Sequence, residues 1–221
     1  MTEQQQPRDP GKLSATLAVW LYVYLAAQVC FSLSSGYQIL LLSEYDPSTP
    51  ASYWETLPGT EIFVLTAGVL GLFLVVSWLV AGFLTLKWIY RVNKNAHVLA
   101  TGLRSSPGWS VGWYFIPFAL LWKPFKGLEE AWKVSADPAR WESVQTPSLL
   151  RWWWGLWLVN NIVSNASARL SLQADTIGLV LLSNYCDLAS GMLTVPLVLV
   201  LVAVVRRLTL NQSRELQQRV F

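Results

Sequence analysis

Charged residues are scarce in this sequence. Asp, Glu, Lys and Arg make up only 13% of the 221 residues, whereas an average soluble domain carries roughly 25%. Hydrophobic residues make up 53%, and the mean hydropathy is +0.39. Because a soluble fold of this size could not bury so much apolar surface, the composition excludes an ordinary soluble domain and predicts a single helical membrane domain.

Cysteine, histidine and the usual catalytic motifs are also rare or missing. Cys30 and Cys186 each lie in an apolar run without Cys-x-x-Cys spacing, and His97 is the single histidine. One histidine excludes a bis-histidine haem and a three-histidine zinc site. The sequence has no Gly-rich phosphate loop, no Gly-x-Ser-x-Gly and no His-Glu-x-x-His. We therefore expect no metal and no cofactor, and the sequence leans against an enzyme.

Four apolar stretches are long enough to cross a bilayer, because about 20 helical residues span a hydrocarbon core of roughly 30 Å. The sequence thus predicts an all-α membrane protein with four transmembrane helices in one membrane domain, residues 13–206. Polar tails are expected before and after it, at 1–12 and 207–221. The predicted spans are residues 13–43, 61–90, 150–170 and 176–206.

Residues 105–122 are apolar too, but this stretch is short and is interrupted by proline and glycine. If it does not cross, every Lys and Arg except Arg169 falls on one side of the membrane, which agrees with the positive-inside rule. We therefore expect a re-entrant or interfacial segment here. The same rule predicts a multi-pass protein of the inner (plasma) membrane with both termini in the cytoplasm.

A tryptophan-rich connector follows the second predicted span. Residues 87–157 hold ten of the thirteen tryptophans, mixed with Lys, Arg and Pro, as is typical of the headgroup level of a membrane. Within it, residues 123–135 predict an amphipathic helix with Phe125, Leu128 and Trp132 on its apolar face. We expect this helix to lie along the cytoplasmic membrane surface, with Lys126–Glu130 and Glu129–Lys133 pairs on its polar side. Membrane contact accounts for the basic and aromatic residues, so nucleic acid is not an expected partner.

Two motifs stand out in this region. The first consists of Trp88, Arg91 and Asn95, and the second is a longer Pro/Trp pattern formed by Pro107, Trp109, Trp113, Pro117, Pro124, Glu130 and Trp132. Both resemble motifs of a bacterial integral membrane family catalogued as domain of unknown function 4328, whose first motif is Trp-x-x-Arg-x-x-x-Asn. Leu120 departs from the second motif, because the family usually has Asn there. The resemblance implies a multi-helix bacterial inner-membrane protein and brings no assigned activity.

One polar site is expected inside the membrane. An ionised side chain in hydrocarbon is costly and is kept mainly when it is paired or functional. Asp187 lies about eleven residues into the last predicted span, close to Asn184. The preceding span carries Asn161, Asn165 and Arg169 at intervals of four, hence on one helix face. We expect Asp187 to pair with that face, either as a structural clamp or as an ion, proton or solute site.

Three functions remain open at this point. The first is a non-enzymatic interaction or regulatory membrane component, acting through the lipid bilayer and a protein partner or a second copy of itself. The second is a transporter or channel for a small solute or ion that uses the polar site around Asp187. The third is an intramembrane enzyme acting on lipids or isoprenoids. An exposed aromatic patch on a solid core would favour the first, a polar cavity reaching Asp187 the second, and a carboxylate-lined pocket open to the headgroups the third.

Overall fold

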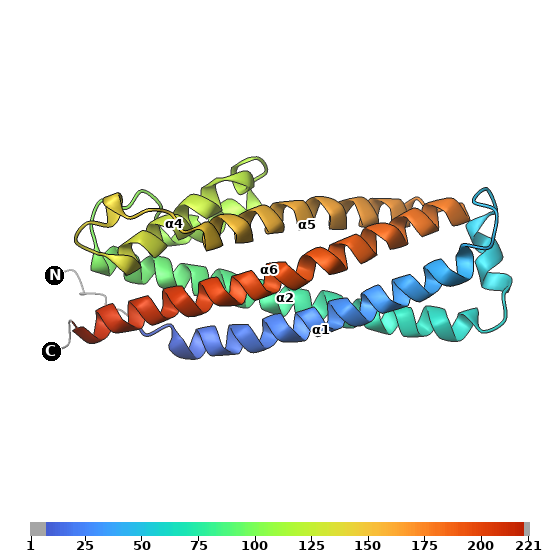
Figure 1. Ribbon diagram of the computed structural model, residues 1–221, viewed down its shortest axis with the longest axis horizontal. Coiled ribbons are helices and arrows are strands. Elements are labelled where there is room, and N and C mark those ends of the chain that lie inside the picture. The colour runs from blue at the N-terminus through green and yellow to red at the C-terminus, as the bar shows by residue number, and fades with distance from the viewer. Residues whose placement is uncertain (1–7, 219–221) are drawn as a thin grey trace. The chain divides into compact units, whose positions relative to one another are not determined.

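The computed structural model describes residues 8–218. The outermost parts of the two predicted polar tails, residues 1–7 and 219–221, lie outside the described residues. Residues 8–218 form helices and contain no named strand. Four of the helices are long (Figure 1), namely α1 (Gly11–Leu42), α2 (Thr60–Leu99), α5 (Ser148–Leu172) and α6 (Ile177–Gln218).

Each predicted span coincides with one long helix. Among the described residues, three helices are both long and apolar enough to cross a membrane: α1, α2 and α6. The helix α5 is not one of them, because Arg151, Asn165 and Arg169 and several Ser and Asn residues lower its hydropathy. The structure therefore shows an all-helical membrane protein with three candidate membrane-spanning helices.

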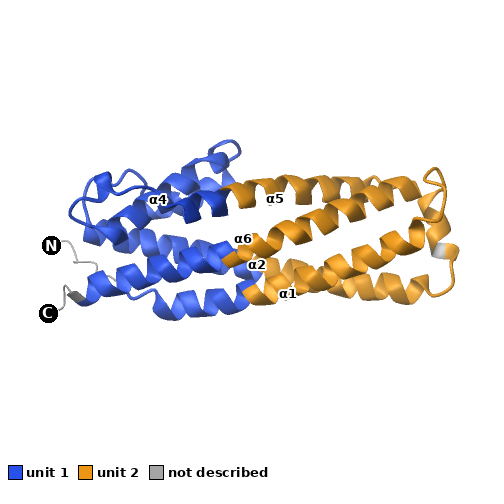
Figure 2. Ribbon diagram, in the orientation of Figure 1, with its two compact units in different colours: residues 1–21, 80–154, 200–221 blue, residues 22–79, 155–199 orange. Residues whose placement is uncertain are grey.

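The chain divides into two compact units, coloured separately in Figure 2. Unit 1 holds residues 1–21, 80–154 and 200–221, and unit 2 holds residues 22–79 and 155–199. Each long helix contributes one part to each unit.

Unit 2 consists of segments of the four long helices. Phe63 of α2 has its ring 5.8 Å from that of Tyr37 of α1, so these two helices are neighbours. The helix α1 also contacts α6 closely, because a Cβ on Gly191 would lie only 2.1 Å from Oγ of Ser32. A side chain at 191 would therefore clash with the side chain of Ser32, and small residues of this kind are typical of membrane helix interfaces. The helices α5 and α6 are joined by hydrogen bonds described below.

Two loops of unit 2 are tied together by backbone hydrogen bonds. The amides of Ile177 and Gly178, at the start of α6, donate to the carbonyls of Thr49 and Pro47 at 2.9 and 3.0 Å. These amides have no acceptor within their own helix, so the loop between α1 and α2 satisfies them. The loop continues into the short 3₁₀ helix η1 (Ala51–Thr56). The connection between α1 and α2 is therefore fixed against the connection between α5 and α6.

Unit 1 contains the shorter helices. Residues 105–122 fold into three of them, each too short to cross a membrane, and the predicted amphipathic helix is present as a fourth. A single 3₁₀ turn follows it. The elements are α3 (Pro107–Gly112), η2 (Trp113–Phe115), η3 (Ala119–Leu121), α4 (Lys123–Ala136) and η4 (Trp141–Ser143).

The apolar face of α4 is not free to cover a membrane. Leu128 and Val134 are fully buried, and Trp132 is only 8% exposed. Asn93 of α2 donates a hydrogen bond of 3.0 Å to the carbonyl of Gly127 on α4. The amphipathic pattern was correct, but this face packs inside unit 1, because protein segments from α2 and the preceding turns cover it.

The helix α6 is longer than expected. The sequence predicts a polar tail after residue 206, whereas α6 continues to Gln218. Leu208, Thr209 and Gln212 are buried in unit 1. The helix persists because these side chains pack, and Gln212 donates a hydrogen bond of 2.8 Å to the carbonyl of Val92.

Candidate functional site

One face of α5 carries a row of buried and half-buried polar side chains that bind α6. Ser164 and Ser190 are joined through their hydroxyls at 2.7 Å. Asn160 donates to Oγ1 of Thr194 at 3.3 Å and accepts from Oγ of Ser190 at 3.1 Å. Hydrogen bonds between membrane helices contribute about 0.6–2 kcal/mol each, so this row holds the α5–α6 hairpin together.

Asp187 lies at the end of that row. Oγ of Ser167 donates a hydrogen bond of 2.5 Å to its Oδ1 atom and also contacts the Ser183 carbonyl at 3.3 Å. Within residues 8–218, Asp187 has no other hydrogen bond and no ion pair. Its carboxylate is half-buried and has one donor, and no positive charge compensates it.

The expected partners of Asp187 are not the observed ones. Asn161 and Asn165 donate to the carbonyls of Trp157 and Asn161 on their own helix, at 2.7 and 2.8 Å. Arg169 is exposed and forms no ion pair with Asp187. The partner helix α5 was predicted correctly, but its facing row is displaced by one residue, which rotates it by about 100° around the helix.

Asn184, which was also predicted, is buried beside Asp187 on α6. Its amide donates a hydrogen bond of 3.0 Å to Oε1 of Gln38 on α1. Sequence reasoning missed Gln38, because a lone glutamine in an apolar run gives no signal of a partner 146 positions away. The carboxylamide pair connects the Asp187 region to a third helix.

A pocket of about 590 Å³ opens inside unit 2 and reaches Asp187. Its volume falls within the range of about 300–1,000 Å³ that small-molecule sites occupy. Ser52 of η1 and Asp175 of the connection between α5 and α6 are exposed and belong to its lining, so it extends from these two connections into the long helices. Asp187 is the eleventh residue of α6, about 15 Å from the start of that helix at 1.5 Å per residue.

The lining combines polar and aromatic side chains. The aromatic part includes Trp54 and Phe63, whose rings meet edge to face with centroids 5.5 Å apart, and also Phe31. Trp54 is held in place by a small core with Leu42 and Ile177. The polar part consists of Ser34, Ser35, Gln38, Ser52, Ser171, Asp175, Ser183, Asn184 and Asp187.

This arrangement can bind a small polar molecule. Carboxylates and amide groups supply hydrogen bonds, and the aromatic rings supply an apolar wall, which is the usual composition of a ligand site. In the described part of the chain, no group of three or more His, Cys, Asp or Glu side chains is arranged to hold a metal ion.

The residues of the first sequence motif lie in unit 1 and hold its helices together. The indole nitrogen of Trp88 donates to Oγ1 of Thr209 at 3.1 Å. Asn95 bonds with both backbone groups of Arg8 and donates to Oε1 of Gln212 at 3.1 Å. Arg91, which lies between these two residues in the sequence, is half-buried. These contacts join α2, α6 and the segment before α1.

The second motif shapes the short helices of unit 1. Pro107 begins α3, and the rings of Trp109 and Trp113 stack with centroids 4.5 Å apart. Glu130 accepts a hydrogen bond of 3.0 Å from the amide of Ser105, not the predicted contact with Lys126. Pro117 is exposed, and Pro124 and Trp132 are buried. The motif therefore specifies a scaffold, and the pocket contains none of its residues.

Glu129 is the electrostatic centre of unit 1. It is 7% exposed and forms ion pairs with Lys126 at 2.8 Å and with Lys133 at 3.2 Å, the latter as predicted. Burial opposes its ionisation, but hydrogen bonds from Lys126, Thr146 and Lys133 outweigh burial and lower its pKa below the ordinary value. Thr146 thereby attaches the loop before α5 to α4.

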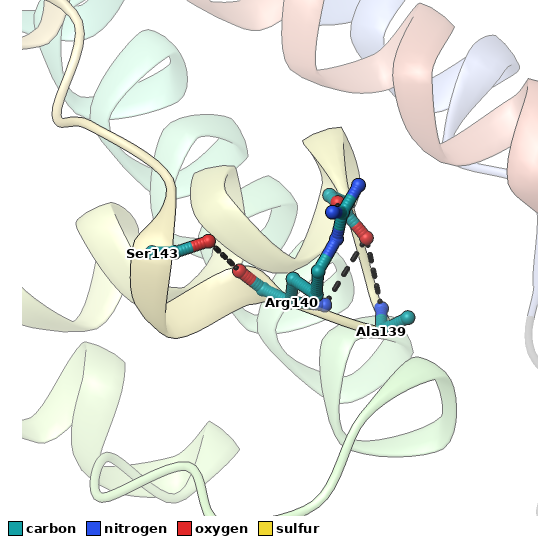
Figure 3. Close-up of polar contacts among 4 residues, drawn as sticks. Ala139, Arg140 and Ser143 are labelled. Atoms are coloured by element: carbon teal, nitrogen blue, oxygen red, sulfur yellow. Dashed lines mark hydrogen bonds and ion pairs between the residues drawn. The ribbon is translucent and has the colours of Figure 1, made fainter.

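That loop has its own local order (Figure 3). Oδ1 of Asp137 accepts from the amides of Ala139 and Arg140, both at 3.1 Å, and Oγ of Ser143 donates to the Arg140 carbonyl at 2.8 Å. Such Asp-centred turns fix a loop without a core.

Neither a curated protein nor a solved structure matches the chain. A family model described as Domain of unknown function (DUF4328) matches residues 55–210, which is more than half of the chain. The matched range includes both scaffold motifs and most of the α5–α6 hairpin. This chain therefore belongs to the family defined by that domain of unknown function.

Proposed function

We propose that this protein is a non-enzymatic membrane component that binds a small polar solute in the pocket of unit 2. The observation that carries the proposal is the pocket of about 590 Å³ that extends from exposed Ser52 and Asp175 to Asp187. A polar cavity that reaches Asp187 supports solute recognition for transport, whereas an enzyme acting on lipids would need a pocket open to the headgroups. The binding step is the part of that function for which the pocket supplies the groups.

The proposal includes four crossings by α1, α2, α5 and α6, with both termini in the cytoplasm of a bacterial inner membrane. Fifteen of the sixteen Lys and Arg residues then lie on the cytoplasmic side, which includes both termini, and Arg169 is the exception. The helix α5 crosses despite its lower hydropathy because its buried polar row faces α6 and not lipid. The pocket then opens to the outer side.

Residues 105–122 are proposed to lie in the cytoplasmic interface of the bilayer. Phe115 and Phe118 are 73% and 78% exposed, and Trp109 and Trp122 are about half exposed. Large aromatic side chains exposed next to basic residues are typical of headgroup contact. Lys123 lies 5.5 Å from the ring centroid of Trp113, which fits this environment.

The same exposed aromatic residues support a second candidate function, an interaction or regulatory component. In that case the surface formed by Trp109, Phe115, Phe118 and Trp122 binds a protein partner at the membrane surface. This function is compatible with solute binding, since a solute-responsive component needs both a pocket and an output surface.

A plug variant tests solute binding. Ser52→Trp places an indole in the pocket lining at an exposed position of η1, and Gln173→Trp adds the same group at an exposed position of the connection between α5 and α6 that is not part of the lining. Purified protein in lipid nanodiscs is titrated with cationic, zwitterionic, neutral and anionic small solutes, and the shift of its melting temperature is measured. A ligand that binds only the folded protein raises that temperature.

We expect at least one solute class to stabilise the native protein and the Gln173→Trp control, but not Ser52→Trp. Stabilisation that persists unchanged in Ser52→Trp would place the binding elsewhere. No stabilisation by any class would contradict solute binding in this pocket.

A further inference from the structure

We propose that the solute is a small organic cation, with its ammonium group bound by Asp187 and its carbon groups covered by the aromatic side chains that line the same pocket. This inference rests on the proposed function, because it names the chemical class of the solute for the same pocket. It goes beyond that function by fixing the sign of the charge and the groups that recognise it.

The carboxylate of Asp187 has no ion-pair partner among the described residues. Asp187 lines the pocket, is half-buried and receives one hydrogen bond, from Ser167. A positive partner stabilises a carboxylate that is partly removed from water, because it offsets the desolvation cost of the ionised form. Within residues 8–218 no Lys, Arg or His forms an ion pair with it. A cation that enters the pocket would supply the missing charge.

Unit 2 as a whole carries a negative net charge. Unit 2 contains six acidic residues and one basic residue, Arg169, so its net charge is −5. The pocket lining contains Asp175 and Asp187 and no basic residue. Acidic loop residues around an opening concentrate cations there and repel anions. The field of the unit therefore selects the same sign as Asp187.

The pocket suits an organic cation better than a metal ion. A dehydrated metal ion needs several oxygen ligands within about 2–2.6 Å, which a cavity of about 590 Å³ with two carboxylates does not arrange. The amides of Asn184 and Gln38 are already bonded to each other. The volume instead suits a molecule of several heavy atoms.

Aromatic side chains form part of the pocket wall. Trp54, Phe63 and Phe31 line the same pocket as Asp187. Aromatic faces attract cations and also provide an apolar surface for the carbon groups of an organic cation. Packing against the Leu42 and Ile177 core and against Phe63 keeps Trp54 in a fixed orientation. A preorganised ring lowers the entropy cost of binding.

The test uses choline and its neutral isostere 3,3-dimethylbutan-1-ol, which have the same shape and differ in charge. Binding of each to the full chain in nanodiscs is measured by equilibrium dialysis, together with butyrate as an anion. We expect choline to bind more tightly than the neutral isostere by about tenfold or more, as a charge-assisted contact predicts. Raising the salt concentration should weaken choline binding only.

Two variants assign the charge to the pocket. Asp187→Asn keeps an acceptor for Ser167 and removes the charge, and Asp175→Asn removes the second lining carboxylate at an exposed position. Glu44→Gln is the control, since it removes one exposed negative charge of unit 2 outside the lining. We expect choline affinity to fall about tenfold or more in Asp187→Asn, less in Asp175→Asn, and to be unchanged in Glu44→Gln. If Asp187→Asn does not fold, the comparison of Asp175→Asn with Glu44→Gln decides.

Each remaining outcome overturns the inference. Equal binding of choline and its isostere, or choline binding unaffected by removal of the pocket carboxylates, contradicts a cation site. If neutral or anionic solutes bind and Ser52→Trp blocks them, the proposed function holds and the cation inference is wrong. If no probe binds, both are wrong.

Discussion

The hydroxyl of Ser167 donates a 2.5 Å hydrogen bond to the carboxylate of Asp187, across the hairpin formed by α5 and α6. Among residues 8–218, it is the only hydrogen bond that the carboxylate receives, and it fixes the orientation of the carboxylate in unit 2. Because Ser167 is 4% exposed, water cannot replace it easily. The position of the charge in the pocket therefore depends on a single side chain of the neighbouring helix.

Ser167→Ala should lower the free energy of unfolding in mixed micelles by about 1–2 kcal/mol, because it leaves the half-buried carboxylate without a donor. Ser164→Ala is the matched control. It removes one hydroxyl pair of the same row, Ser164 with Ser190, and should cost less, about 0.6 kcal/mol. In an Asp187→Asn background the two substitutions should have similar effects. A larger loss for Ser164→Ala would mean that the carboxylate has another donor.

Unit 1 should depend on pH through Glu129. Its pKa is lower in the folded protein than the ordinary value of 4.5 expected for the unfolded chain, so ionised Glu129 stabilises the fold at every pH above that value. The stability is then lost as the pH falls below about 4.5 and through the folded-state pKa. Hydrogen exchange of residues 137–147 should accelerate there, since Thr146 loses its anionic acceptor.

Glu129→Gln should produce that loosened loop already at pH 7 and remove the pH dependence. Glu142→Gln, which neutralises an exposed carboxylate with no ion pair among the described residues, should behave like the native protein. Unchanged exchange in Glu129→Gln at pH 7 would show that the ion pairs with Lys126 and Lys133 do not hold this region.

Trp132→Ala should destabilise the protein by about 3–5 kcal/mol, because it removes a buried indole from the interior of unit 1. Trp122→Ala makes the same truncation at a side chain that is half exposed and should change the unfolding free energy by about 0.5 kcal/mol or less. Denaturation in mixed micelles measures both. Similar values for the two variants would return the apolar face of α4 to the membrane surface.

Cysteine labelling in intact cells tests the proposed topology. In a variant whose Cys30 and Cys186 are replaced by Ala, a membrane-impermeant maleimide should label Ser52→Cys from outside. Thr101→Cys and Ser143→Cys should be labelled only after the membrane is opened, because residues 105–122 between them do not cross. Labelling of Thr101→Cys and Ser143→Cys from opposite sides would make that segment a transmembrane crossing.

The positions of the four long helices could be predicted from the sequence, because uncharged runs of this length have few other structures in a protein. The facing row of α5 could not. Asn161, Asn165 and Arg169 follow the same helical period as Asn160, Ser164 and Ser167, so periodicity alone does not say which row meets α6. That choice depends on Ser183, Ser190 and Thr194 of the partner helix.

The candidate site was predicted in part for a related reason. A carboxylate inside an apolar run is a strong local signal, and Asp187 does line the pocket. Gln38, Trp54 and Asp175 come from three other segments, and only the folded unit brings them together. The amphipathic pattern of α4 was equally ambiguous, because a membrane surface and the side of a neighbouring helix both cover one apolar face.

The most direct test of the account is the access of charged reagents to the level of Asp187. Ser183→Cys lies in the pocket lining one helical turn before Asp187, and Ser190→Cys is an equally buried control outside the lining. Both are prepared in the variant without Cys30 and Cys186 and treated from outside with a trimethylammonium-ethyl or a sulfonatoethyl methanethiosulfonate. We predict that the cationic reagent modifies Ser183→Cys much faster than the anionic one, that choline slows it, and that Ser190→Cys is unreactive. Equal rates with both reagents, or no reaction at Ser183→Cys, would contradict a cation-binding pocket at Asp187.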